Sequence, residues 1–349
     1  MRGLAAAIML QGHAFHAFIR PEYREQGPYV ISQFFGGIAP AVFLFLTGVT
    51  LAFRLASRER LGVPVGGRIL SGLRRAGYLL MLAVLFRLQL WLFGWPSAPW
   101  TDLLKVDILN CMALAVATLS ITAVFQTSER IRVCAALGVA IALAGPLVTQ
   151  VGGMLGPSLL VDYLIPSHNA FSYFPWAAFV AFGISVGSAL RVVPPQRMER
   201  VMQWIAISGF GLILGSRFVA DLPYKGYPQV DFWLDSPWLI LIKLGVLLLI
   251  LSASYLWNEH AVGKSWSWIR QLGTTSLLVY WVHIELVYGR WVSGWKESLS
   301  TGQVLVVAAC LIVLMVGLSV ARTHWKGLTS SAREALSYCF STTRRVSGD

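Results

Sequence analysis

About ten apolar runs of membrane-spanning length recur along the chain, and they constrain its fold more than any other feature. A helix needs about 20 apolar residues to cross a bilayer, and only helices and closed barrels satisfy their backbone hydrogen bonds there. Charged residues make up 13% of the chain, against about 25% in soluble domains. The sequence therefore predicts an all-α, polytopic integral membrane protein. The expected helices are 3–18, 32–53, 76–95, 108–125, 133–148, 173–190, 201–218, 237–257, 274–288 and 304–321.

The basic residues predict which side of the membrane each connection faces. The formal net charge of +12 is typical of nucleic-acid binding as well, but the arginines gather in alternate short connections between apolar runs, densest in 54–75. Such connections lie in the cytoplasm by the positive-inside rule. We therefore expect both termini in the cytoplasm, one transmembrane domain over 1–325, a short basic cytoplasmic tail over 326–349, and no nucleic-acid partner. The expected location is the plasma membrane, the inner membrane in a bacterium.

The first apolar run carries three ionisable side chains, Arg2, His13 and His16. Arg2 and His13 are about three turns apart on one helical face, roughly 16 Å along the axis, and His16 lies beside His13 at i+3. Ionisable groups inside a bilayer are costly and usually face a protein interior or a wet cavity. Two readings are open: a functional site, or an arginine anchor with two satisfied core histidines. The pairing of two histidines above an arginine favours function.

Further polar residues lie late in the chain and in the outward connections. Ser276, Tyr280 and His283 fall at i, i+4 and i+7 and form one stripe, for which interhelical hydrogen bonding is an equal explanation. Arg87 and Lys243 stand inside apolar runs, where an ion pair is the simpler account: Arg87 with Asp107 or Glu285, and Lys243 with an acceptor on a neighbouring helix.

Five short motifs occur in order along the chain: Arg2-Gly3-Leu4-Ala5 followed by His13, Phe43-Leu44-Phe45-Leu46-Thr47-Gly48, Asp107-Ile108-Leu109, Phe174-Pro175-Trp176, and the run from Leu272 to His283. In order and spacing they resemble the motifs of the transmembrane acyltransferase superfamily. Within it they are more similar to bacterial proteins like the catalytic domain of heparan-alpha-glucosaminide N-acetyltransferase than to the related type 3 acyltransferases.

The resemblance implies transfer of an acyl group, commonly acetyl from acetyl-CoA, to a sugar hydroxyl or amine of a glycan or glycolipid outside the cytoplasm. His13 is then the expected general base or acyl carrier, because histidine has an ordinary pKa near 6.5. Arg2, His16 and His283 are expected to support it. Relatives carry an Asp where Met1 stands and a His or Gln where Asn110 stands. Since 3–18 is also short for a span, we expect the native chain to begin upstream of Met1.

The donor's phosphates need cationic partners, and arginine suits bidentate phosphate contacts. The expected anchors lie in the arginine-rich connection, although topology alone explains such a connection. They are Arg54, Arg58, Arg68, Arg74 and Arg75.

The expected acceptor contacts are Asp107, His168, Ser276 and Tyr280, with plain solvation as the alternative for Asp107 and His168. No metal is expected, since the sequence holds neither HExxH nor a Cys/His cluster.

A secondary transporter is the rival function, because charges inside apolar runs and Gly/Pro-interrupted spans are typical of transporters too. Transporters show paired broken helices in two corresponding halves. The polar signature here is concentrated in the first run, which favours the enzyme.

Overall fold

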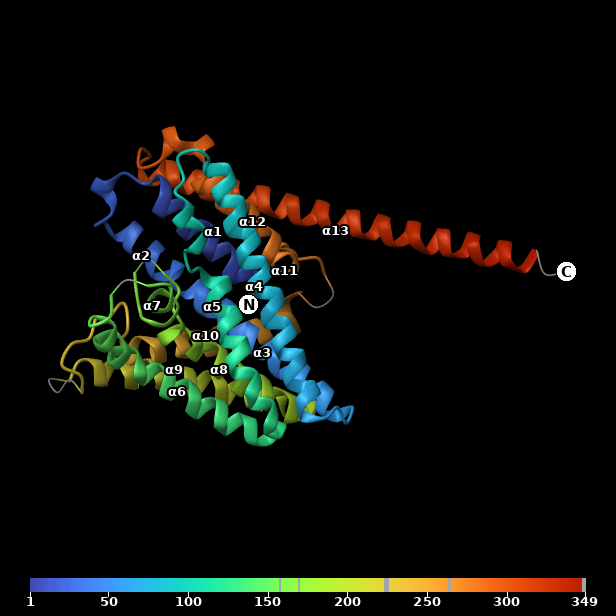
Figure 1. The fold of residues 1–349 in the computed structure, drawn as a ribbon, viewed down its shortest axis with the longest axis horizontal. Coiled ribbons are helices and arrows are strands. Elements are labelled where there is room, and N and C mark those ends of the chain that lie inside the picture. The colour runs from blue at the N-terminus through green and yellow to red at the C-terminus, as the bar shows by residue number, and fades with distance from the viewer. Residues whose placement is uncertain (157, 169, 223–225, 263–264, 347–349) are drawn as a thin grey trace. The chain divides into compact units, whose positions relative to one another are not determined.

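The computed structural model describes residues 1–156, 158–168, 170–222, 226–262 and 265–346, with the side chains of 261–262 and 326–346 excepted. All regular elements among these residues are helices (Figure 1). The side chains of the expected tail, 326–349, lie outside the described residues. The tail boundary at 325 and the cytoplasmic placement of both termini stay predictions.

Eight helical segments in the described chain are long and apolar enough to cross a membrane. Each expected apolar run lies, to within two residues at either end, inside one of these segments or inside one of the shorter helices α1 and α12. The prediction of an all-α polytopic membrane protein is therefore confirmed. The principal helices are α1 (Arg2–Phe18), α3 (Ile38–Arg60), α4 (Val65–Gly94), α5 (Ile108–Leu119), α6 (Thr127–Gly152), α8 (Tyr173–Val192), α9 (Met198–Ala220), α10 (Pro237–Leu256), α12 (Ser276–Tyr288) and α13 (Thr301–Val346).

The helix ends differ from the expected ones for two reasons. Several helices run on past their apolar part into charged residues, so α4 begins at Val65 and α3 continues to Arg60. Two expected helices are broken. The short helix α2 (Gly27–Gly36) precedes α3, and α11 (Trp268–Thr274) precedes α12. A pattern of apolar residues reports burial in lipid but not where the helical hydrogen bonding is interrupted.

The helices form two compact units. Unit 1 comprises Met1 and Gly37–Gly263, and unit 2 comprises Arg2–Gly36 and Lys264–Asp349. Within unit 1, α8 packs against both α3 and α6, and α9 packs against α10 (Figure 1). A Cβ on Gly48 would overlap the carbonyl oxygen of Val180, and one on Gly183 would overlap that of Phe45. The α3–α8 crossing therefore depends on small residues, as is common between membrane helices.

In unit 2, α1 packs against α2, α11, α12 and α13. A Cβ on Gly3 would overlap the carbonyl oxygen of Ile269 at one end of α1. Further along, the Gln11 side chain donates to the carbonyl of Ser32, and the Gln33 side chain donates to the carbonyl of Gly12, both at 3.1 Å. These reciprocal hydrogen bonds hold α1 against α2, and they flank the turn of α1 that carries His13.

Candidate functional site

Unit 2 brings together two histidines that are 270 residues apart in the chain. Nδ1 of His13 on α1 lies 2.9 Å from Nε2 of His283 on α12. Their rings stack with centroids 5.1 Å apart and an interplanar angle of 19°. The side chain of His283 is fully buried, and that of His13 is half-buried. Sequence reasoning singled out each histidine separately, and the fold joins them.

The hydrogen bonds around this pair assign its tautomers. Nδ1 of His283 lies 2.8 Å from the carbonyl oxygen of Val279, and a carbonyl only accepts, so this nitrogen carries the hydrogen. In a neutral ring the other nitrogen, Nε2, is then the acceptor. Nδ1 of His13 must therefore donate to it. His13 is left with its Nε2 as an acceptor, which is the form that a general base or a nucleophile requires.

Two tyrosines on α12 border the histidine pair. The ring of Tyr288 meets that of His13 edge-on, with centroids 5.6 Å apart, and its hydroxyl lies 3.1 Å from Nδ1 of His16. The ring of Tyr280 lies 5.9 Å from that of His283. Sequence reasoning included Tyr280 and missed Tyr288, because a spacing of five residues from His283 does not repeat on a helical face.

The other residues expected around His13 lie further along the same helices. Arg2 is exposed at the start of α1, about 16 Å along the helix from His13. Ser276 begins α12, two turns before His283. The exposed His16 contacts the pair through Tyr288. The compact part of the site is therefore His13, His283 and the two tyrosines.

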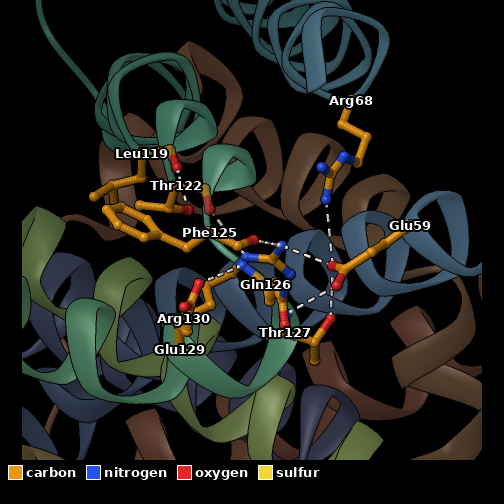
Figure 2. Close-up of polar contacts among 9 residues, drawn as sticks. All are labelled: Glu59, Arg68, Leu119, Thr122, Phe125, Gln126, Thr127, Glu129 and Arg130. Atoms are coloured by element: carbon orange, nitrogen blue, oxygen red, sulfur yellow. Dashed lines mark hydrogen bonds and ion pairs between the residues drawn. The ribbon is translucent and has the colours of Figure 1, made fainter. Parts of the chain in front are cut away.

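In unit 1, a carboxylate binds one of the arginines expected to hold the donor. Glu59 at the end of α3 forms an ion pair with Nη1 of Arg68 at 3.4 Å (Figure 2). It also accepts hydrogen bonds from the Thr127 backbone at 3.1 Å, the Thr127 hydroxyl at 2.8 Å and Nη2 of Arg130 at 3.1 Å. We call these four residues the Glu59 cluster. Arg54, Arg74 and Arg75 are exposed and Arg58 is half-buried.

Arg130 is the centre of this cluster, and nothing in the sequence sets it apart from the other arginines of the short connections. Its side chain is fully buried. Besides Glu59, it donates from Nε to the carbonyl of Thr122 at 3.1 Å and from Nη2 to that of Phe125 at 2.7 Å. Figure 2 shows the guanidinium between these carbonyls and the carboxylate. Arg130 thereby ties the start of α6 to the end of α3 and satisfies carbonyls that precede α6.

Two intramembrane cations find partners within unit 1. Nε of Arg87 on α4 lies 3.3 Å from Oδ2 of Asp107, so of the two carboxylates considered for Arg87 the structure selects Asp107. Nζ of Lys243 lies 5.0 Å from the ring centroid of Trp176, a cation–π contact with the neighbouring α8.

Asp107 also caps α5, since its Oδ1 accepts from the backbone of Leu109 and Asn110. The Asn110 side chain donates to the hydroxyl of Tyr163 at 3.0 Å. Burial of that hydroxyl, and the charge of Asp107 near it, raise the pKa of Tyr163 above its ordinary value. The phenol therefore stays protonated and can donate.

His168, the remaining acceptor candidate, is exposed in unit 1, where its Nε2 lies 3.2 Å from Oδ2 of Asp231. In the part of the chain that the structure describes, no group of three or more His, Cys, Asp or Glu side chains is placed to hold a metal ion.

The fold and its buried polar sites define a multi-pass membrane protein. Residues 1–213 match the family described as heparan-alpha-glucosaminide N-acetyltransferase, catalytic. The chain belongs to this family, as its motifs indicate. By class it is a membrane-bound acetyltransferase. The match includes His13 and Asp107, whereas His283 lies beyond it. No curated protein and no solved structure matches the chain.

Proposed function

We propose that the protein transfers an acetyl group from cytoplasmic acetyl-CoA to an amine or hydroxyl of a glycan or glycolipid on the other side of the membrane, with His13 as the central residue. The chain of hydrogen bonds from His13 through His283 to the carbonyl of Val279 carries this proposal. It leaves Nε2 of His13 as an acceptor inside a bilayer-spanning unit. Family membership favours this enzyme over the secondary transporter.

In direct transfer, Nε2 of His13 takes the proton of the acceptor O–H or N–H as that oxygen or nitrogen attacks the thioester carbonyl carbon. The C–S bond then breaks, and the CoA thiolate recovers the proton from the imidazolium. His283 accepts the Nδ1–H of His13 throughout, so it holds the ring and stabilises its charged form. In the alternative route Nε2 itself attacks the carbonyl and the C–S bond breaks, so that CoA leaves as the thiolate. The protonated acetylimidazole then passes the acetyl group to the acceptor, and the thiolate takes the acceptor's proton.

The arginine-rich connection between α3 and α4 is the proposed anchor for the donor's phosphates. The exposure of Arg54, Arg74 and Arg75 supports it, as does the chemistry of guanidinium and phosphate. Arg68 is the weaker candidate, since a phosphate would compete with Glu59 for it. The proposal requires this connection to face the cytoplasm. A topology reporter fused at residue 60 that responds on the external side would reject it.

The proposal is tested with membrane vesicles given radiolabelled acetyl-CoA and assayed for labelled glycan and labelled protein. His13→Ala should reduce transfer roughly 10²- to 10⁴-fold, the usual contribution of general acid–base catalysis, while its melting temperature stays close to that of the wild type. Label retained on wild-type protein and absent from His13→Ala selects the acetylimidazole route. Near-normal transfer by folded His13→Ala protein removes His13 from the mechanism.

A further inference from the structure

A second group of polar side chains gathers in unit 1, on neighbouring helices α4, α5 and the short α7 (Leu159–Leu164). Asp107 and Asn110 are 5% and 8% exposed. We call this group the α4–α5 cluster: Arg87, Trp91, Asp107, Asn110 and Tyr163. Its internal contacts are the Arg87–Asp107 ion pair and the Asn110–Tyr163 hydrogen bond described above.

These internal contacts use only part of the cluster's hydrogen-bonding capacity. Four buried polar atoms have no hydrogen-bond partner among the described residues: Nε of Arg87, Nε1 of Trp91, Oδ2 of Asp107 and Oδ1 of Asn110. Nε of Arg87 and Oδ2 of Asp107 are the two atoms of the 3.3 Å ion pair and face each other, whereas Nε1 of Trp91 and Oδ1 of Asn110 have no polar partner among the described residues. Trp91 lies one turn after Arg87 on α4, so both face the same side.

Unpaired buried polar atoms are uncommon, because most find a partner and each one costs roughly 1–3 kcal/mol. Two such atoms, on Trp91 and Asn110, lie on packed helices beside an ion pair, and they indicate a place where a partner outside the protein completes the hydrogen bonds. The aromatic rings of the cluster supply apolar surface, and its Asp, Asn and Arg supply a few polar groups at fixed positions. This is the usual composition of a small-molecule site.

The chemistry of the four atoms selects the ligand. Arg87 and Trp91 offer donors, and Asp107 and Asn110 offer acceptors. The charge of Arg87 cancels that of Asp107, so the cluster as a whole favours neither a phosphate nor an ammonium group. A hydroxyl both donates and accepts, so adjacent hydroxyls match such a mixed set. The rings of Trp91 and Trp95, with centroids 5.4 Å apart, add apolar surface beside it.

We propose that the α4–α5 cluster binds the hydroxyls of a neutral polyhydroxylated ligand, that is, a sugar. The identification of this sugar as part of the acetyl acceptor rests on the proposed function. The expected contacts are hydroxyl hydrogens to Asp107 Oδ2 and Asn110 Oδ1, and hydroxyl oxygens to the N–H groups of Arg87 and Trp91.

The test measures binding of methyl β-D-glucopyranoside to the full chain in lipid nanodiscs by saturation-transfer NMR. Inorganic phosphate is the second probe, and its binding is followed on the 31P signal. Asn110→Leu should weaken glucoside binding about tenfold or more. Trp91→Phe keeps the aromatic ring and removes only the indole N–H, and should weaken binding severalfold. Thr118 lies on α5 as Asn110 does, and its hydroxyl bonds to the Tyr173 hydroxyl on α8. Thr118→Val removes that hydroxyl, is the matched control and should leave binding unchanged.

Trp91→Phe also separates a ligand contact from a structural one. Removing a buried donor without a partner should leave the melting temperature unchanged or higher, whereas a structural hydrogen bond would lower it. Glucoside binding that is absent from the wild type, unchanged in Trp91→Phe and Asn110→Leu, or replaced by phosphate binding overturns the proposal. His13→Ala should bind the glucoside normally. If the wild type binds the glucoside through the cluster but transfers no acetyl group, the proposed function is rejected and the sugar site is kept. If the wild type transfers acetyl groups but the cluster does not bind the glucoside, the sugar site is rejected and the proposed function is kept.

Discussion

In the Glu59 cluster of unit 1, both carboxylate oxygens of Glu59 accept hydrogen bonds, and Arg130 is surrounded by this carboxylate and two carbonyls. In the histidine pair of unit 2, the side chain of His283 is fully buried as well. The chain of hydrogen bonds nevertheless ends at Nε2 of His13, which is left as an acceptor. Both sites hold ionisable groups that sequence reasoning could only describe as charges or histidines near a membrane. Their bonding separates them: both oxygens of the Glu59 carboxylate are satisfied by the protein, although Nη1 of Arg130 and Nε of Arg68 have no hydrogen-bond partner among the described residues, whereas the histidine pair ends in an acceptor to which the proposed function assigns the reacting group.

The largest expected effect is on stability, in the Glu59 cluster. Arg130→Met should lower the free energy of unfolding by about 3 kcal/mol, because it leaves the carbonyls of Thr122 and Phe125 without their donor and removes one of the two cations that bind the half-buried Glu59. The measurement is the melting temperature of the purified protein, with Arg132→Met, an exposed neighbour, as the control. The folded fraction should keep its transfer rate at saturating acetyl-CoA. Normal stability with lost transfer would reverse the contrast between the sites.

The next effect is on turnover, in the histidine pair. His283→Phe keeps the bulk of the ring and removes the acceptor for Nδ1–H of His13, so kcat should fall about 10²-fold, less than in His13→Ala. The pH–rate profile should move as well, because His13 loses its hydrogen-bonded partner. His260→Phe, a surface histidine of unit 1, is the control. A large drop in melting temperature together with a normal rate would make His283 a structural residue.

Thr127→Val tests a single bond of the Glu59 cluster. The change removes the 2.8 Å hydroxyl donor to Glu59 and keeps the backbone donor. The expected loss is about 1 kcal/mol in unfolding free energy, with no change in transfer. Thr50→Val, whose hydroxyl bonds only to a nearby carbonyl of its own helix, provides the comparison. A loss as large as that of Arg130→Met would mean that Thr127 and Arg130 act as one unit.

The smallest effect is expected at His16. Its side chain is exposed and reaches the site only through the hydroxyl of Tyr288, so His16→Ala should change the transfer rate by about threefold or less. Steady-state kinetics at several acceptor concentrations measure this. A loss comparable to that of His13→Ala would move the reacting position from one histidine to the other.

The membrane-spanning helices could be predicted from the sequence, because a helix that lies in lipid needs a long run of apolar residues. The sequence did not reveal the breaks before α3 and α12, since helical hydrogen bonding can stop inside an apolar run. Nor could it distinguish Arg130 from the exposed arginines of neighbouring connections. The carbonyls of Thr122 and Phe125 come from the segment before α6 and the carboxylate of Glu59 from the end of α3, and no residue-type pattern joins the two.

The candidate site was predictable in its parts and not in its assembly. His13 and His283 each stand out as polar residues in apolar helices. Periodicity predicts which residues share a face of one helix, but it does not predict contacts between two helices. The tautomer of His13 depends on the carbonyl of Val279, a backbone atom that every residue carries. Tyr288 gave no signal, because its position beside His13 depends on how α1 packs against α12.

The pairing of α1 with α12 also has a consequence for biosynthesis. The ribosome makes His13 almost first and His283 270 residues later, a delay of roughly 15–50 s at the usual 5–20 residues per second. Throughout that interval the nascent chain holds His13 without the imidazole to which it donates. If His13 acts as proposed, the protein is inactive until α12 has been made, and two separately produced fragments divided between α1 and α12 should regain activity only on association.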